Sequence, residues 1–120
     1  MKEFGYQRAH DVTGAVALLA ADPDARYLGG GTNLVDTMKL DVSRPEVVID
    51  LNGLGETGLR RIEVTDAGIR FGALVRMADA EQHEVVRRRF PVITESLTLA
   101  ASPQIRNMAS LAGNLLQRTR

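Results

Sequence analysis

The chain has 120 residues, 44% of them hydrophobic, which is enough for one compact domain with its own core and too few for two comfortable ones. Fifteen Lys and Arg residues balance fifteen Asp and Glu residues, which argues against a general nucleic-acid-binding protein. No apolar run approaches a membrane span, and the N-terminal residues do not predict a secretory signal. The lack of cysteine excludes disulfides, cysteine-bound metal and thiol catalysis here and fits a cytoplasmic setting.

The first part of the chain has the element order of a small parallel sheet. Val12, Ala15, Val16 and Leu19 recur at helical spacing, so the pattern predicts a helix over 11–21 that ends at Asp22-Pro23-Asp24. Four elements are predicted after it: a strand over 26–28, a glycine turn over 29–31, a short helix over 34–39 and a continuous apolar strand over 47–51. Alternating helices and strands favour parallel pairing.

The pattern changes around residues 52–57, where we place a boundary between two subdomains, 1–54 and 55–120. Four elements are predicted in the second part: a hairpin of two strands, 59–64 and 68–72, and two helices, 78–90 and 92–101. Arg87-Arg88-Arg89 is interpreted as a solvated helix end, with a partner or phosphate patch as the alternative. Together the two parts indicate the α+β class.

The glycine-rich segment Leu28–Leu34 is the first candidate for a ligand-binding site. Three consecutive glycines after a strand permit positive φ and close approach of another group to the backbone. Their amides and the first N–H groups of the next helix are suited to an anion such as a pyrophosphate, and Thr32 and Asn33 offer polar side chains. The alternative is a tight turn that binds nothing. The segment matches neither the dinucleotide fingerprint nor a P-loop.

A second segment, Ala100–Leu115, combines small residues with polar amides. We expect a loop here whose backbone closely approaches a planar or charged ligand, or else tight packing between a helix and a strand. The other polar candidates are weaker. His10 and His83 have no partner at metal-ligand spacing, and capping or helix-face roles suit Asp36 and Asp50.

The chain resembles the FAD-binding subunit of the molybdenum hydroxylases, the family of xanthine dehydrogenase and aldehyde oxidoreductase. The resemblance rests on Leu28–Leu34, Ser102–Asn107, Ser110–Asn114 and the following stretch to Arg120. The resemblance covers essentially the whole chain. It implies the N-terminal part of the vanillyl-alcohol-oxidase-type FAD-binding fold, in which a small parallel βαβ unit is followed by the start of a second α+β subdomain and the flavin site lies between the two.

The resemblance also implies roles for particular residues. The backbone of Leu28, Gly29, Gly30, Gly31, Thr32, Asn33 and Leu34 would hold the FAD pyrophosphate, and Ala100, Ser110, Gly113 and Asn114 would line the flavin. Ala112 departs from the family, in which a second glycine commonly precedes Gly-Asn. No residue is expected to act as a catalytic acid or base, and no metal is expected to bind to this chain.

The implied function is electron transfer within a larger enzyme. A partner subunit with a molybdenum cofactor would oxidise the substrate, and iron–sulfur clusters in another would deliver electrons to FAD in this chain and then to an external acceptor. Family subunits are much longer, so we expect a truncated product or fragment, with weak FAD binding on its own and possible self-association. A single-chain oxidase of the same fold and an interaction module without flavin remain alternatives.

Overall fold

The structure is a computed structural model that describes residues 1–117, apart from the side chain of Glu56. It divides the chain into two compact units, one ending at Thr57 and the next beginning at Gly58. The sequence placed this boundary after residue 54. Buried hydrophobic side chains occur in both units.

The first unit contains a three-stranded sheet of β1 (Gly5–Arg8), β2 (Arg26–Leu28) and β3 (Val47–Asp50). All pairings are parallel and the order is β1-β3-β2, which confirms the predicted small parallel sheet. Val48 pairs with residues on both neighbours, and it is buried together with Ile49. The central position of β3 explains its continuous apolar sequence, because such a strand is covered on both faces.

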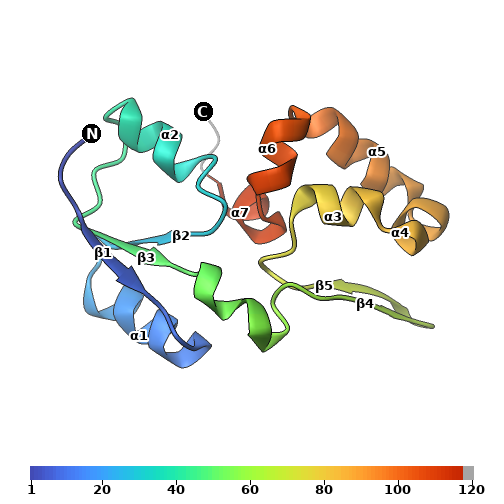
Figure 1. Ribbon diagram of the computed structural model, residues 1–120, viewed down its shortest axis with the longest axis horizontal. Coiled ribbons are helices and arrows are strands. Elements are labelled where there is room, and N and C mark those ends of the chain that lie inside the picture. Colours follow the sequence, from blue (N-terminus) through green and yellow to red (C-terminus); the bar gives the residue numbers. More distant parts are fainter. Residues whose placement is uncertain (118–120) are drawn as a thin grey trace. The chain divides into compact units, whose positions relative to one another are not determined.

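Two helices, α1 (Val12–Ala21) and α2 (Leu34–Lys39), lie on opposite faces of this sheet (Figure 1). The connection from β1 to β2 passes over β3, and the connection from β2 to β3 returns, so right-handed crossovers place the two helices on opposite faces. Asp11 caps α1 by accepting a hydrogen bond of 2.6 Å from the N–H of Gly14. A 3₁₀ helix, η1 (Asn52–Thr57), follows β3.

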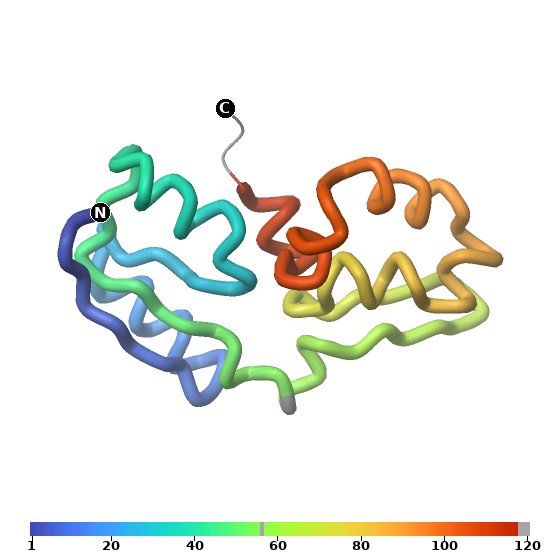
Figure 2. Tube along the Cα trace, turned by 45° about the horizontal axis from the view of Figure 1, so that its top comes forward, coloured from blue at the N-terminus to red at the C-terminus, as the bar shows by residue number. Residues whose placement is uncertain are grey.

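The second unit opens with the predicted antiparallel hairpin, formed by β4 (Ile62–Thr65) and β5 (Gly68–Phe71). Five short helices follow: α3 (Met77–Gln82), α4 (Glu84–Arg89), α5 (Pro91–Ala100), α6 (Pro103–Met108) and α7 (Leu111–Leu116). Figure 2 shows α3 running along the hairpin, as it also does in Figure 1.

The core of the second unit joins the helices to one face of the hairpin. Its buried side chains are Val75, Met77, Ala80, Leu97 and Ala109, and the half-buried Ile62, Phe71, Ile93 and Leu111 pack against them. Ile62 and Phe71 are cross-strand partners, so one end of the hairpin supplies both of its core side chains.

Two sequence predictions were wrong in this unit. The helix predicted over 78–90 is interrupted at His83, whose backbone is extended (φ −65°, ψ 120°), so α3 and α4 are separate helices. The second segment, expected to be a loop, is mostly helical, because Ser102 and Ser110 each start a new six-residue helix. The sequence analysis did not recognise Ser102 and Ser110 as N-caps, because the residues around them are small and show no helical periodicity.

Candidate functional site

The segment Leu28–Leu34, the glycine loop from here on, follows the carboxyl end of β2 and leads into α2. Of its three glycines, Gly31 is the one in the left-handed region, with φ at 77°. A β-carbon at Gly31 would lie 3.3 Å from Cγ2 of Val35 and 3.4 Å from Cδ1 of Leu28. A side chain at Gly31 would therefore meet both backbone strain and crowding.

The glycine loop presents a row of backbone donors. Within the described residues, the N–H groups of Gly30, Gly31, Thr32 and Asn33 donate to no protein acceptor. The loop's carbonyls are used instead: the Gly31 oxygen accepts from the N–H of Val35 at 3.0 Å, and the Asn33 oxygen accepts from Thr37 at 2.9 Å. Consecutive free donors before a helix fit the oxygens of an anion such as a diphosphate.

Two hydrogen bonds connect the glycine loop to the residues that directly follow β3. The N–H of Leu51 donates to the Leu28 oxygen at 3.0 Å, and Nδ2 of Asn52 donates to the Gly29 oxygen at 2.9 Å. The first continues the pairing of the parallel strands by one residue. The second is a side-chain contact from η1, and sequence patterns gave no indication of it because 23 positions separate the two residues.

Asp50 ends β3 with only 7% of its surface exposed. Burial alone would raise the pKa of its carboxyl, but hydrogen bonds from the Tyr6 hydroxyl and from Asn52, together with the charge of Arg8, leave the pKa below its usual value. The hydrogen bond between Tyr6 and Asp50 raises the pKa of the Tyr6 hydroxyl. Asp50 accepts the N–H of Asn52, the first residue of η1, which is a capping contact and one of the two roles expected for it. Its other oxygen accepts the hydroxyl of Tyr6 on β1.

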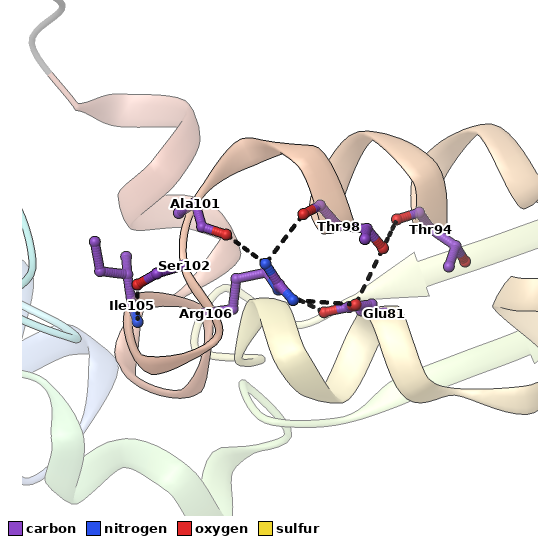
Figure 3. A network of polar contacts seen from close by, with 7 residues as sticks. All are labelled: Glu81, Thr94, Thr98, Ala101, Ser102, Ile105 and Arg106. Carbon is purple, nitrogen blue, oxygen red and sulfur yellow. Dashed lines mark hydrogen bonds and ion pairs between the residues drawn. The ribbon is translucent and has the colours of Figure 1, made fainter.

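The second segment is fixed by a buried arginine (Figure 3). Arg106 in α6 forms an ion pair with Glu81 of α3, with Nε 2.7 Å from Oε2, and its Nη1 donates to the Thr98 oxygen at 3.0 Å. Nη1 also donates to the Ala101 oxygen, and the Thr98 hydroxyl donates to Glu81. Arg106 is therefore a structural residue that holds the α5–α6 turn against α3.

Ser110 is buried and caps α7, because its hydroxyl accepts the N–H of Gly113 at 3.3 Å. A β-carbon on Gly113 would lie 2.8 Å from that hydroxyl oxygen. Gly113 thus has a local reason to be glycine, whether or not a ligand binds. Asn114 follows one residue later, and its side-chain oxygen accepts from Gln117 at 3.1 Å.

Residues 73–77 pair with residues 109–112 and so position the start of α7. The N–H of Leu111 donates to the Val75 oxygen at 2.9 Å, and that of Met77 donates to the Ala109 oxygen at 2.9 Å. Arg76 and Ser110 form an antiparallel bridge between these bonds. Ala112, the departure from the family pattern, is half-buried and donates its N–H to the Ala73 oxygen at 3.2 Å.

The sequence-predicted residues lie in two groups. The glycine loop belongs to the first unit, whereas Ser110, Gly113 and Asn114 lie at the start of α7 in the second and Ala100 ends α5. His10 is exposed beside α1, and His83 is half-buried at the α3–α4 break, not on a helix as predicted. Arg118 and Arg120, part of the predicted match, lie outside the described residues.

No helix among the described residues has the length and apolar character needed to cross a bilayer. Nor do three or more His, Cys, Asp or Glu side chains within residues 1–117 gather as a metal site.

Comparison with known proteins gives a consistent result. Residues 2–120 match the family described as the FAD binding domain in molybdopterin dehydrogenase. The chain is 53% identical to the aldehyde oxidoreductase FAD-binding subunit PaoB of Escherichia coli K12, across all of this chain and 37% of that protein. It is 35% identical to the carbon monoxide dehydrogenase medium chain of Hydrogenophaga pseudoflava, across 93% of this chain and 39% of that one.

Solved structures agree. A carbon monoxide dehydrogenase from Hydrogenophaga pseudoflava superposes with a TM-score of 0.88 at 35% identity, covering 95% of this chain and 39% of that one. Quinoline 2-oxidoreductase from Pseudomonas putida 86 gives 0.87 at 26% identity, covering 96% and 40%. The chain belongs to the family of FAD-binding domains of molybdopterin dehydrogenases, which confirms the predicted family and fold, and it spans about two fifths of the length of these relatives.

Proposed function

We propose that this chain binds FAD and carries electrons within a molybdenum-dependent dehydrogenase. The observation that carries the proposal is the row of N–H groups from Gly30 to Asn33, which donate to no acceptor among the described residues. The loop is hydrogen-bonded to the segment that follows β3, and the chain belongs to a family of FAD-binding domains. Neutral amide donors held in place suit a pyrophosphate, because they need no rearrangement when the anion arrives.

The individual roles follow the two groups of residues. The cofactor's pyrophosphate is held by the glycine loop, that is, by Leu28, Gly29, Gly30, Gly31, Thr32, Asn33 and Leu34. The flavin lies against the second group, Ala100, Ser110, Gly113 and Asn114. Bound FAD supplies the redox chemistry, taking up electrons and passing them on. The protein's part is to bind and orient the cofactor, and no described side chain is assigned a proton-transfer role.

The larger enzyme would supply the rest. PaoB is named as an FAD-binding subunit and the carbon monoxide dehydrogenase relative as a medium chain, so each is one part of an assembly. By analogy, the partners of this chain are a subunit with the molybdenum cofactor, where the substrate is oxidised, and a subunit with iron–sulfur clusters. A cytoplasmic location suits a chain without cysteine.

The test is FAD content after Gly30→Val in the full-length protein. A branched side chain at Gly30 keeps the pyrophosphate away from the neighbouring N–H groups, so we expect most of the bound flavin to be lost. Gly5→Val is the matched control in the same unit, since a β-carbon there meets its neighbours at an ordinary 3.5 Å. Visible absorption measures flavin and circular dichroism measures folding. A folded Gly30→Val protein with stoichiometric FAD would refute the proposal.

A further inference from the structure

A polar cluster lies beside the glycine loop without belonging to either predicted group of site residues. It consists of Tyr6 on β1, Asp50 at the end of β3 and Asn52 at the start of η1. Both carboxylate oxygens of Asp50 are occupied: Oδ2 accepts from the Tyr6 hydroxyl at 2.6 Å, and Oδ1 accepts from the N–H and Nδ2 of Asn52 at 2.8 and 2.7 Å. A buried carboxylate with these donors is firmly held.

The cluster fixes the orientation of the Asn52 amide. Its Nδ2 lies within hydrogen-bond distance of Asp50 Oδ1 and of the Gly29 carbonyl oxygen. Both of these oxygens are acceptors, so the NH₂ end must face them and the amide oxygen must face away. The two N–H bonds of one side chain thus link the end of β3 to the glycine loop.

This link determines where the next donor points. The carbonyl of Gly29 and the N–H of Gly30 belong to one planar trans peptide, in which C=O and N–H point in opposite directions. Holding the Gly29 oxygen against Asn52 therefore turns the Gly30 N–H away from η1. Gly30 is the first of the consecutive residues whose N–H groups donate to no described acceptor.

We propose that Asp50 and Asn52, supported by Tyr6, are positioning residues that orient the glycine loop for the pyrophosphate of the cofactor. The inference rests on the proposed function, since it assumes that the loop receives FAD. It adds three residues that contact the cofactor only through the loop. Their removal should act on binding of the diphosphate more than on folding.

The experiment measures FAD affinity by titration into the flavin-free full-length protein, together with the ³¹P resonances of the bound pyrophosphate. Asn52→Ala should lower the affinity about fivefold to tenfold, the equivalent of one lost hydrogen bond, and shift the ³¹P resonances. Tyr6→Phe should lower it about twofold to threefold. Because Tyr6 is largely exposed, this variant carries the test if Asn52→Ala fails to fold.

Tyr27→Phe is the matched control. Its hydroxyl also donates a hydrogen bond in the first unit, to the Ala15 oxygen at 2.8 Å and not to a residue of the cluster. It should leave FAD affinity and ³¹P resonances unchanged even if the melting temperature falls. Wild-type affinity in folded variants of Asn52 and Tyr6, or an equal loss in Tyr27→Phe, overturns the inference alone. A wild-type protein that does not bind FAD overturns the proposed function as well.

Discussion

At Gly72 the backbone passes so close to the segment before the hairpin that no side chain fits. A β-carbon there would lie 2.3 Å from the Leu59 carbonyl oxygen and 2.8 Å from that of Gly58. The contact is held by the hydrogen bonds Gly72 N–H to Arg61 oxygen and Leu74 N–H to Leu59 oxygen, at 2.9 and 2.7 Å. The obstacle is backbone, which cannot move aside as the end of a side chain can.

We therefore expect Gly72→Ala to reduce the free energy of unfolding by about 2–3 kcal/mol, the upper part of the usual range for overpacking, because the obstacle is backbone. Gly5→Ala, with its nearest atoms at 3.5 Å, should change it by less than about 1 kcal/mol. Urea unfolding followed by circular dichroism compares the two. Similar midpoints would show that the chain relaxes around residue 72.

The lowered pKa of Asp50 leads us to expect that stability depends on pH. Burial opposes its charge, but the hydrogen bonds from Tyr6 and Asn52 favour it by more, so the pKa in the folded state is lowered. A lowered folded pKa contributes stability that is present above the unfolded value of about 3.9 and is lost as pH falls through the folded value. Stability should thus decline on acidification below about pH 4, and Asp50→Asn should flatten that decline.

The measurement is the urea midpoint between about pH 6 and pH 3. Asp24→Asn, on the exposed turn before β2, removes a surface carboxylate and is the reference variant against which the slope of Asp50→Asn is compared. An unchanged slope in Asp50→Asn would mean that other carboxylates account for the acid sensitivity.

The ion pair of Arg106 and Glu81 connects α6 to α3. Only 11% and 18% of the two side chains is exposed. Arg106→Met would leave the Glu81 carboxylate half-buried without its partner and free the carbonyls of Thr98 and Ala101, so we expect a loss of about 3 kcal/mol in unfolding free energy. Arg44→Met breaks the exposed pair with Asp41 and should cost less than about 1 kcal/mol. Equal costs in thermal unfolding would contradict this assignment.

At the scale of elements, predictability followed the strength of the local pattern. The short helix after the glycine turn and the continuous apolar run of β3 were predicted closely, and β3 is indeed largely buried. β1 was missed, since Gly-Tyr-Gln-Arg on a sheet edge has no apolar alternation and all four residues are exposed. Ser102-Pro103 did contain a helix-start signal, an N-cap followed by proline at the first helical position, which the small residues around it obscured.

The same limit applies to the candidate site. Three glycines between a strand and a helix were enough to predict a donor-rich loop. The hydrogen bond from Asn52 to Gly29 joins residues 23 positions apart, and the ion pair of Arg106 with Glu81 joins residues 25 positions apart. Such pairings arise from the fold, and single-sequence patterns do not specify them. The assignment of individual residues to FAD stays a prediction.

At the scale of the whole molecule, the second unit exposes much apolar and unpaired surface. Leu99, Leu115 and Leu116 are each more than 80% exposed, with values of 86%, 82% and 85%. The hairpin is a two-stranded sheet, so each of its strands has an edge without a strand partner in the described chain. Exposed apolar side chains and open strand edges favour association with another copy.

We expect the 120-residue chain, prepared alone, to form dimers or larger oligomers at micromolar concentration and to bind FAD weakly. The double variant Leu115→Ser, Leu116→Ser should shift the chain towards monomer, because burial of serine side chains in an interface does not give the hydrophobic stabilisation that burial of leucine gives. Val42→Ser, at a 68% exposed position in the first unit, is the control and should leave the oligomer unchanged. Size-exclusion chromatography with light scattering, followed by FAD titration, measures both properties. A stable wild-type monomer that binds FAD tightly would show that these two units tolerate their exposed surface and need no further contact to hold the cofactor.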